Sequence, residues 1–277
     1  MLSLMYITNI PEVAQIAISS GAQRIFIDME TLGKDKRQKG LDTVQCRHTI
    51  DDVRNMKNEL PNCTVLVRCN PIHDKVEGYE SSEEEINEII SAGANIIMLP
   101  YFHTADEVKR FIKIVDGRAR TMLLFETPSA IANIDEILKV DGIDECFIGL
   151  NDLSLGWGKK FMFEILADGT VQKICDVFKK ANKPYGFGGI ASLGSGDLRS
   201  EKIIAEHYRL GSSCVILSRS FCNLNTINEP TKVERIFEQG IRAIRDFERK
   251  CINDDIDFEA NRKSVVEDVD KIVNKLV

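Results

Sequence analysis

Eight short apolar runs alternate with longer amphipathic segments along most of this 277-residue chain. They span residues 2–7, 24–29, 64–69, 96–99, 121–125, 146–150, 185–190 and 214–217. Each run is almost continuously apolar, which is typical of strands that are covered on both faces in a parallel sheet. Strands that alternate with helices indicate an α/β fold, and eight is the number of strands that closes a barrel.

The intervening segments have the spacing of amphipathic helices. We expect helices over residues 11–20, 82–91, 104–115 and 128–138, with Ser82 as a possible cap of the second and Pro128 opening the last. The sequence therefore predicts a (β/α)8 TIM barrel over residues 1–250. A doubly wound open sheet is the alternative, because periodicity does not reveal whether a sheet closes.

Two amphipathic segments follow the eighth run. Residues 231–249 form one long helical pattern, and Val265, Val269, Ile272 and Leu276 form the apolar stripe of another. We predict that residues 251–277 are a C-terminal helical extension of the barrel. Its stripe has two interpretations: packing against the outside of the barrel, or a contact between subunits of a homo-oligomer.

Composition narrows the class of protein. The net charge of −7 argues against nucleic acid as a general partner, because binding to phosphate backbones needs a basic face. The eight cysteines form no CxxC pair, and Cys69, Cys146 and Cys214 fall inside strand-like runs, as reduced and buried thiols do. No run is long enough to span a bilayer, and no signal peptide is evident. We therefore expect a cytoplasmic protein without a membrane partner.

Charged residues stand where the predicted strands end, which is where barrel enzymes place their active sites. Glu126 follows the fifth run and Asp152 follows the sixth. Neighbouring strands lie about 4.8 Å apart, so two carboxylates at this rim would repel unless a cation or a shared proton lies between them. Carboxylates with water are the ligands that Mg²⁺ or Mn²⁺ prefers. The alternative is that each residue caps the helix after it. Only a metal explains both residues together, so we predict a site for Mg²⁺ or Mn²⁺.

Arg68 ends an otherwise apolar run. It could form an ion pair with Asp28 or Glu30, which follow the neighbouring second run, or it could bind a substrate carboxylate with its two-pronged guanidinium. The two roles are compatible. We predict Arg68, Asp28 and Glu30 as catalytic residues, with His103 and metal-bound hydroxide as further candidates for the base.

Two loops at the same rim are candidates for binding. The segment 33–40 carries Lys34, Lys36, Arg37 and Lys39, so it is either a solvated loop or a site for an anionic part of a ligand. Gly188 and Gly189 allow close approach of the backbone to a ligand or simple packing. The sequence GFGG is not a dinucleotide fingerprint, because that pattern opens a helix near the first strand.

At these residues the sequence resembles the HpcH/HpaI aldolase and citrate lyase β-subunit family. The matching stretches are GAQRIFIDME (21–30), VRCN (67–70), GANIIMLP (93–100), ETPSA (126–130), GIDECFIGLNDLSLG (142–156) and GGIA (188–191). The resemblance implies a barrel of the type that handles phosphoenolpyruvate and pyruvate, usually oligomeric. It also implies Mg²⁺ or Mn²⁺ held by Glu126 and Asp152, with Arg68 stabilising an enolate.

The chain departs from the family at two positions. Pyruvate aldolases of the family commonly have a histidine base in an Asp-x-Glu-His pattern, and this chain has Thr31 at that place. They also have a glutamine two positions before the metal glutamate, where this chain has Leu124. The acidic pair Asp28 and Glu30 is more similar to the citrate-lyase branch. We therefore expect a divergent branch of the family.

These observations predict a metal-dependent carbon–carbon lyase that cleaves or forms a bond next to a 2-oxo acid or acyl enolate. Backbone groups near Leu150, Asn151, Gly188 and Gly189 are expected to orient the substrate carboxylate. An acyl-CoA thioesterase or a phosphoenolpyruvate-type transferase on the same site is one alternative. A barrel that binds ligand without catalysis is the other, and the missing histidine motivates it.

Overall fold

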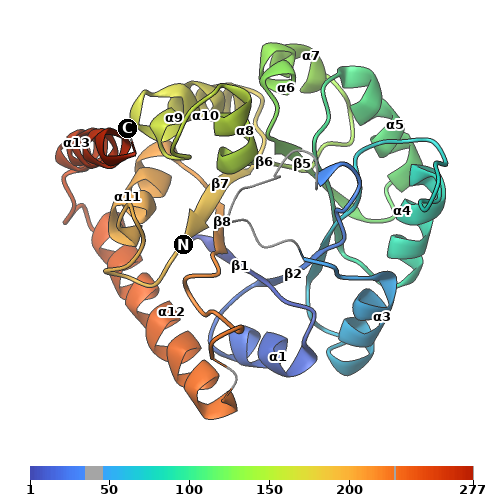
Figure 1. The fold of residues 1–277 in the computed structure, drawn as a ribbon, viewed down its shortest axis with the longest axis horizontal. Helices are drawn as coiled ribbons and strands as arrows, with labels where there is room; N and C mark the ends of the chain where they lie inside the picture. Colours follow the sequence, from blue (N-terminus) through green and yellow to red (C-terminus); the bar gives the residue numbers. More distant parts are fainter. Residues whose placement is uncertain (35–45, 228, 277) are drawn as a thin grey trace.

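The computed structural model describes residues 1–34, 46–227 and 229–276. Eight parallel strands form a closed barrel in chain order, surrounded by helices (Figure 1). The strands are β1 (Ser3–Ile7), β2 (Arg24–Asp28), β3 (Val65–Arg68), β4 (Ile96–Leu99), β5 (Arg120–Phe125), β6 (Glu145–Ile148), β7 (Tyr185–Ile190) and β8 (Cys214–Leu217). The pairing of β1 with β8 closes the barrel, which confirms the TIM barrel and excludes the open sheet.

The helices follow the strands around the outside of the barrel (Figure 1). They are α1 (Pro11–Ser19), α3 (Ile50–Glu59), α4 (Ser82–Ser91), α5 (Ala105–Val115), α6 (Pro128–Ala132), α7 (Ile134–Ile137), α8 (Leu150–Gly156), α9 (Glu164–Ala167), α10 (Thr170–Lys180), α11 (Ser200–Leu210), α12 (Pro230–Ile252) and α13 (Phe258–Lys275). Among the described residues, no helix is long and apolar enough to cross a membrane.

Two local predictions were wrong. The segment 128–138 is not one helix, because Asn133 ends α6 and precedes α7. The cap of α4 is Ser81, not Ser82: the Ser81 side chain accepts a hydrogen bond from the backbone N–H of Glu84, whose carboxylate bonds back to Ser81. This reciprocal arrangement is a capping box, and it satisfies two donors that the helix itself leaves without partners.

The core has two parts, as expected when strands are covered on both faces. One lies between the strands and the ring of helices. The other fills the inside of the barrel, with Phe26, Leu66, Met98, Leu124 and Phe147 among its residues. The barrel is therefore packed, and only its ends are open to ligands.

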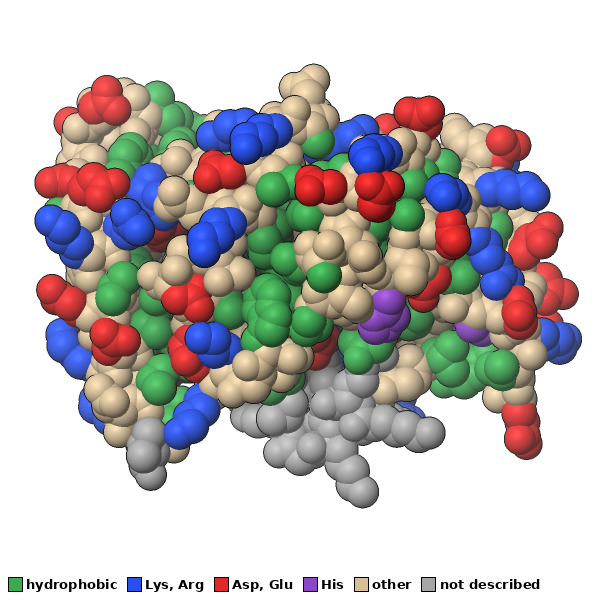
Figure 2. Space-filling view, turned by 90° about the horizontal axis from the view of Figure 1, so that it is seen from above, with side chains coloured by type: hydrophobic (Ala, Val, Ile, Leu, Met, Phe, Trp, Pro, Cys, Tyr) green, Lys and Arg blue, Asp and Glu red, His purple; other side chains and the backbone are tan. Residues whose placement is uncertain are grey.

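The last two helices lie on one side of the barrel. Helix α12 packs against α1 and α11, and α13 packs against α9 and α11 (Figure 1). Val265 and Val269 of the predicted stripe are buried within the chain itself. Packing against the barrel's outer layer thus accounts for this stripe, whereas a subunit contact there stays a prediction. On the face shown in Figure 2, acidic and basic side chains are interspersed.

Candidate active site

A cavity of about 610 Å³ opens at the carboxyl ends of the barrel strands. Its floor consists of Phe26, Met98, Leu124 and Phe147, which also belong to the core inside the barrel. Its walls contain nine of the residues that the sequence predicted for the site: Asp28, Lys34, Arg68, Glu126, Leu150, Asn151, Asp152, Gly188 and Gly189. Strands β2 to β7 therefore bring together side chains that are up to 161 positions apart, from Asp28 to Gly189.

Glu126 directly follows β5 and is buried, with 3% of its surface exposed. Its Oε1 accepts a hydrogen bond of 3.0 Å from the backbone N–H of Tyr101. Tyr101 has a φ of +49°, a left-handed conformation that is uncommon for residues other than glycine. Strained backbone of this kind persists where the surrounding structure holds it in place, and here it directs an N–H group at Glu126.

A glycine on the next strand makes room for the same carboxylate. A Cβ atom on Gly149 would lie 2.8 Å from both Cβ and Oε2 of Glu126, which is too close for any side chain. The backbone N–H of Gly149 bonds to the carbonyl oxygen of Phe125, so the ends of β5 and β6 stay paired up to this point. Glu126 therefore lies against a neighbouring strand that has no side chain at the contact.

Asp152 lies in the first turn of α8, four residues after the end of β6. The predicted strand to residue 150 was too long, since Leu150 already begins this helix. The capping alternative does not apply to either acid: the N-cap of α6 is Thr127, which bonds to the N–H of Ala130, and that of α8 is Gly149. Both carboxylates line the cavity, as a shared cation site requires.

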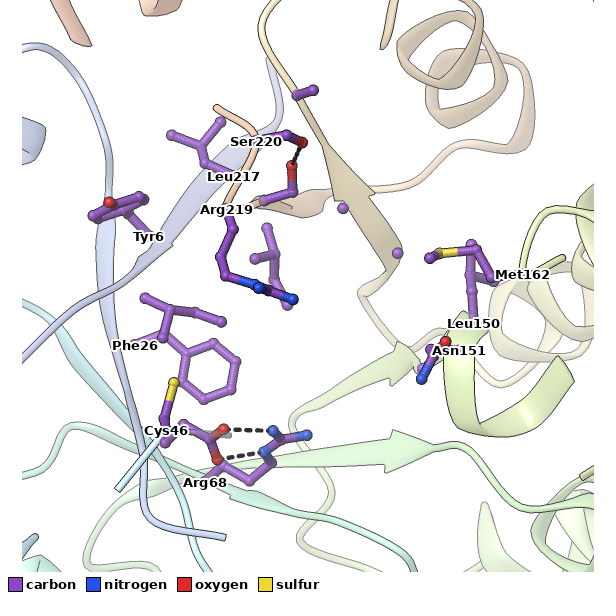
Figure 3. Close-up of a pocket in the computed structure, with 18 of the residues that line it drawn as sticks. Tyr6, Phe26, Cys46, Arg68, Leu150, Asn151, Met162, Leu217, Arg219 and Ser220 are labelled. Carbon is purple, nitrogen blue, oxygen red and sulfur yellow. Dashed lines mark hydrogen bonds and ion pairs between the residues drawn. The ribbon is translucent and has the colours of Figure 1, made fainter. Parts of the chain in front are cut away.

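Arg68 is held by an acidic pair, as its structural interpretation predicted. Its Nε and Nη2 donate to the two oxygens of Asp28 at 2.8 and 2.7 Å, and its Nη1 lies 3.3 Å from Oε2 of Glu30 (Figure 3). The Arg68 side chain keeps 14% of its surface exposed, while Asp28 keeps 3% and Glu30 none. The guanidinium is therefore more exposed than either carboxylate.

Lys34 completes this cluster. Its ammonium lies 2.9 Å from Asp28 and 3.5 Å from Glu30, and its side chain is buried. Burial by itself would raise the pKa of Asp28, but the charges and hydrogen bonds of Arg68 and Lys34 outweigh burial and hold this pKa well below its ordinary value. Lys34 is thus engaged with acidic side chains, whereas Lys36, Arg37 and Lys39 of the predicted anion-binding loop lie outside the described residues.

Glu30 lies in a second, more polar cleft beside the cavity. In this cleft the Asn70 side chain accepts hydrogen bonds from the backbone of Thr31 and Leu32 and donates one to Glu85. Asn70 thereby fixes the loop that follows β2. Glu30 therefore does not line the main cavity, and its link to that cavity is its contact with Arg68.

His48 is a residue of the cavity wall that the sequence did not reveal. Its Nδ1 accepts a hydrogen bond of 3.0 Å from the backbone N–H of Asp28, and burial lowers its pKa, so the ring is neutral with its proton on Nε2. The sequence drew attention instead to His103, which does not line the cavity. The Nδ1 of His103 lies 2.6 Å from the hydroxyl oxygen of Ser129.

One feature of the sequence could have indicated that His48 lies at the rim: it stands directly before Thr49, the N-cap of α3. Residues that precede such a cap belong to the loop between a strand and its helix, which lies at the catalytic rim. The contact with Asp28 could not be predicted from the sequence, because the two residues are 20 positions apart.

Comparisons with known proteins bear on the family and the fold of the chain. The family described as HpcH/HpaI aldolase/citrate lyase matches residues 3–181. The chain is 23% identical over 213 residues to the 4-hydroxy-4-methyl-2-oxoglutarate aldolase of Chaetomium globosum, covering 65% of this chain and 72% of that protein. It is 23% identical over 176 residues to the 2-keto-3-deoxy-L-rhamnonate aldolase of Escherichia coli, covering 53% and 58%. It is 43% identical over 61 residues to the hydroxypyruvate/pyruvate aldolase of Rhizorhabdus wittichii, covering 22% and 24%.

The alignment thus spans less than two thirds of the last two relatives. Among solved structures, an HpcH/HpaI aldolase from Desulfitobacterium hafniense has a TM-score of 0.59 at 15% identity, with 78% of this chain and 86% of that chain covered. A family protein from Burkholderia cenocepacia has a TM-score of 0.60 at 13% identity, with 84% and 94% covered. These likenesses support the fold.

Proposed function

The chain belongs to the HpcH/HpaI aldolase/citrate lyase family, and we propose that it is a divalent-metal-dependent carbon–carbon lyase acting on a 2-oxo acid or a related acyl substrate. One observation carries the proposal: Glu126, Asp152 and Arg68 line the same cavity at the carboxyl ends of the strands. The names of the relatives, which are aldolases of 2-oxo acids, support this substrate class.

The residues present fit Mg²⁺ or Mn²⁺. Both acids offer oxygen ligands, and Glu126 is held in a fixed place beside Gly149. A site with two protein carboxylates leaves positions for water and substrate. Mg²⁺ binds in this way, because it gives up its water reluctantly and usually takes only one or two carboxylates.

Each part of the site has a role in this proposal. A divalent cation bound by Glu126 and Asp152 would supply Lewis-acid stabilisation of the enolate charge that forms when the carbon–carbon bond breaks. Arg68 would hold the substrate carboxylate and the developing charge with guanidinium N–H groups on its cavity side. Backbone groups near Leu150 and Asn151, and at Gly188 and Gly189, would orient the same carboxylate.

Asp28 and Glu30 act on Arg68 in this mechanism. The lowered pKa of Asp28 makes it a poor proton acceptor at neutral pH, and Glu30 does not line the cavity. Both carboxylates instead fix the orientation of the guanidinium. His48, protonated on Nε2, would serve as a hydrogen-bond donor, since its Nδ1 already accepts the N–H of Asp28.

Two variants test the proposal with separate measurements. Oxaloacetate decarboxylation is measured with Mg²⁺, Mn²⁺ or chelator, and Mn²⁺ binding is measured by electron paramagnetic resonance. We expect Asp152→Asn to weaken Mn²⁺ binding and lower turnover together. We expect Arg68→Lys to keep Mn²⁺ binding within about twofold but to lower kcat/KM by about tenfold or more, because an ammonium cannot replace the bidentate fork.

Unchanged Mn²⁺ binding in Asp152→Asn, with the fold intact by circular dichroism, would remove this residue from the metal site. Wild-type activity in Arg68→Lys would remove Arg68 from the mechanism. If the wild-type protein binds Mn²⁺ and pyruvate but turns over no oxaloacetate with either metal, the lyase proposal fails in favour of a barrel that only binds ligand.

A further inference from the structure

A second arginine enters the cavity from the opposite side to Arg68. Arg219 follows the end of β8 by two residues and lines the cavity. In Figure 3 its side chain extends from β8 toward the centre of the cavity, while Arg68 lies near the β2 and β3 ends. The mechanism described above gives Arg219 no role.

Arg219 differs from the other basic side chains of the cavity because it has no acidic partner among the described residues. Arg68 and Lys34 share Asp28 and Glu30, so this cluster is neutral. Glu126 and Asp152 together would balance a divalent cation. Across the part of the chain that the structure describes, Arg219 forms no ion pair, neither with Asp197 of the same cavity wall nor with another acid, and its side chain is exposed. Its guanidinium is therefore not held by a carboxylate and is available to an anionic ligand.

The electrostatic influence of Arg219 reaches across the cavity. Cys46, which Figure 3 shows near Phe26 on the β2 side, has a pKa raised mainly by burial and next by Asp28, and the charges of Lys34, Arg68 and Arg219 partly oppose this rise.

The wall around Arg219 is polar, in contrast to the apolar floor. Ser218 and Ser220 stand on either side of it in the sequence, and their hydroxyl groups bond to each other at 2.8 Å. Asn223 and Asn225, which follow Arg219 in the same loop, also line the cavity, and the Asn223 side-chain oxygen accepts the backbone N–H of Asn225. Asn9 lines the cavity too, but its amide N–H is bonded to Asp52. Hydroxyl and amide N–H groups are donors that accompany arginine in sites for carboxylate or phosphate groups.

We propose that Arg219 binds a second anionic group of the substrate, so that the preferred substrates are 2-oxo acids that carry a negative charge at both ends. One end would lie at Arg68 and the metal carboxylates, and the other at Arg219 with its serine and asparagine neighbours. This inference rests on the proposed function. A cavity of about 610 Å³ falls within the usual range of small-molecule sites and has room for both ends.

The test compares probes that differ only in the second anion. Dissociation constants are measured by calorimetry with Mg²⁺ present for 2-oxoglutarate, for 2-oxopentanoate, which has a methyl group in place of the terminal carboxylate, and for 2-oxo-4-phosphonobutanoate. The proteins are the wild type, Arg219→Gln, Arg219→Lys, and the control Asp197→Asn, which removes a charge from another exposed side chain of the same cavity wall.

We expect the wild type to bind at least one dianionic probe about ten- to hundredfold more tightly than 2-oxopentanoate, as a charge-assisted pair would provide. Arg219→Gln should abolish this preference and leave the affinity for 2-oxopentanoate within about twofold. Arg219→Lys should keep part of the preference, and Asp197→Asn all of it. The dianion that binds more tightly identifies the class of group that Arg219 recognises.

Equal affinity of the wild type for all three probes would overturn the inference, as would a preference that survives in Arg219→Gln. An equal loss of affinity for every probe in that variant would also overturn it, since it would indicate a structural role. If none of the three probes binds to the wild type, the 2-oxo acid site itself is absent, and the proposed function fails. The two failures are thus distinguishable.

Discussion

Asp28, whose pKa is lowered, also positions several side chains of the site. Its two oxygens hold Arg68, and one of them also accepts a hydrogen bond from Lys34, while the backbone N–H of the same residue orients His48. One buried residue thus places three side chains of the cavity wall. Loss of its charge would leave Arg68 and Lys34 with Glu30 as their only acidic partner among the described residues.

We predict that Asp28→Asn lowers the free energy of unfolding by about 3 kcal/mol at pH 7, the cost typical of breaking a buried ion pair. Because the folded-state pKa is lowered, the carboxylate stabilises the fold above its ordinary pKa of 3.8, and this stabilisation is lost as the pH falls below that value. Urea unfolding should therefore show a difference between variant and wild type that is full at pH 7 and shrinks below pH 3.8.

The control for this prediction is Asp106→Asn, which removes an exposed ion pair with Lys109 in α5. Exposed pairs of this kind contribute little, so no pH-dependent difference is expected. A difference for Asp28→Asn that stays constant from pH 7 to pH 2 would contradict the assigned cause.

Sequence reasoning at the residue scale succeeded where partners stand on neighbouring strands. Asp28 and Arg68 face each other in the β2–β3 register, so their pairing followed from the order of the strands. His48 could not be found in this way, because it stands 20 positions from Asp28 and outside the predicted strands. The direction of the Arg219 side chain depends on how the chain leaves β8. Neither property is encoded in periodicity.

At the scale of elements, the junction of β6 and α8 is what brings the two carboxylates to one cavity. Gly149 ends the strand pairing, leaves space for Glu126, and serves as the N-cap of the helix that carries Asp152. The apolar run continues through Leu150, which is why the sequence predicted a longer strand. Leu150 is buried by the helix instead, so apolar character alone did not mark the boundary.

We predict that Gly149→Ala weakens Mn²⁺ binding by about tenfold, because its Cβ would displace the Glu126 carboxylate from its position. The measurement is Mn²⁺ titration monitored by electron paramagnetic resonance, together with the melting temperature. Gly240→Ala is the matched control. Its Cβ would meet the Phe221 ring at 2.7 Å, a similar crowding in α12 with no carboxylate involved.

Both alanine variants are expected to melt at lower temperature than the wild type, and only Gly149→Ala should bind Mn²⁺ more weakly. An equal change in Mn²⁺ affinity for the two variants, or none in either, would show that the contact between Gly149 and Glu126 does not control the metal site.

At the scale of the whole molecule, the two ends of the barrel have different charge networks. The cavity occupies the carboxyl ends, whereas Glu145, at the start of β6, lies at the amino ends. It accepts hydrogen bonds from Arg24 of β2 at 2.7 and 3.1 Å and pairs with Arg120 of β5. Glu145 therefore ties three strands together at the end that has no predicted catalytic residue.

We predict that Glu145→Gln lowers the free energy of unfolding by about 3 kcal/mol, since it leaves the part-buried Arg24 without its carboxylate. Mn²⁺ affinity and kcat/KM should stay within about twofold of the wild type, because stability and activity belong to opposite ends of such barrels. Urea unfolding and the decarboxylation assay check the two parts. A large loss of activity in folded protein would show that the two ends are coupled.

The architecture was predictable because all eight strand segments stand out from their surroundings in the sequence. Closure was not, since it depends on β1 meeting β8 across the length of the chain. The structure also extends α12 through Ile252, so this helix crosses the boundary placed at residue 250. The homo-oligomer stays a prediction.

The contacts of α12 have a consequence for how the protein is made. Glu248 of this helix accepts the backbone N–H of Leu2, 246 positions earlier, and Arg245 bonds to the carbonyl oxygen of the same residue. At ribosomal speeds of about 5–20 residues per second, β1 waits roughly 12–50 s for these partners. Until β8 is made, the edge of β1 that pairs with it also stays unpaired, the kind of surface that invites aggregation. Although β1 precedes the other seven strands of the barrel, it is thus among the last to be secured.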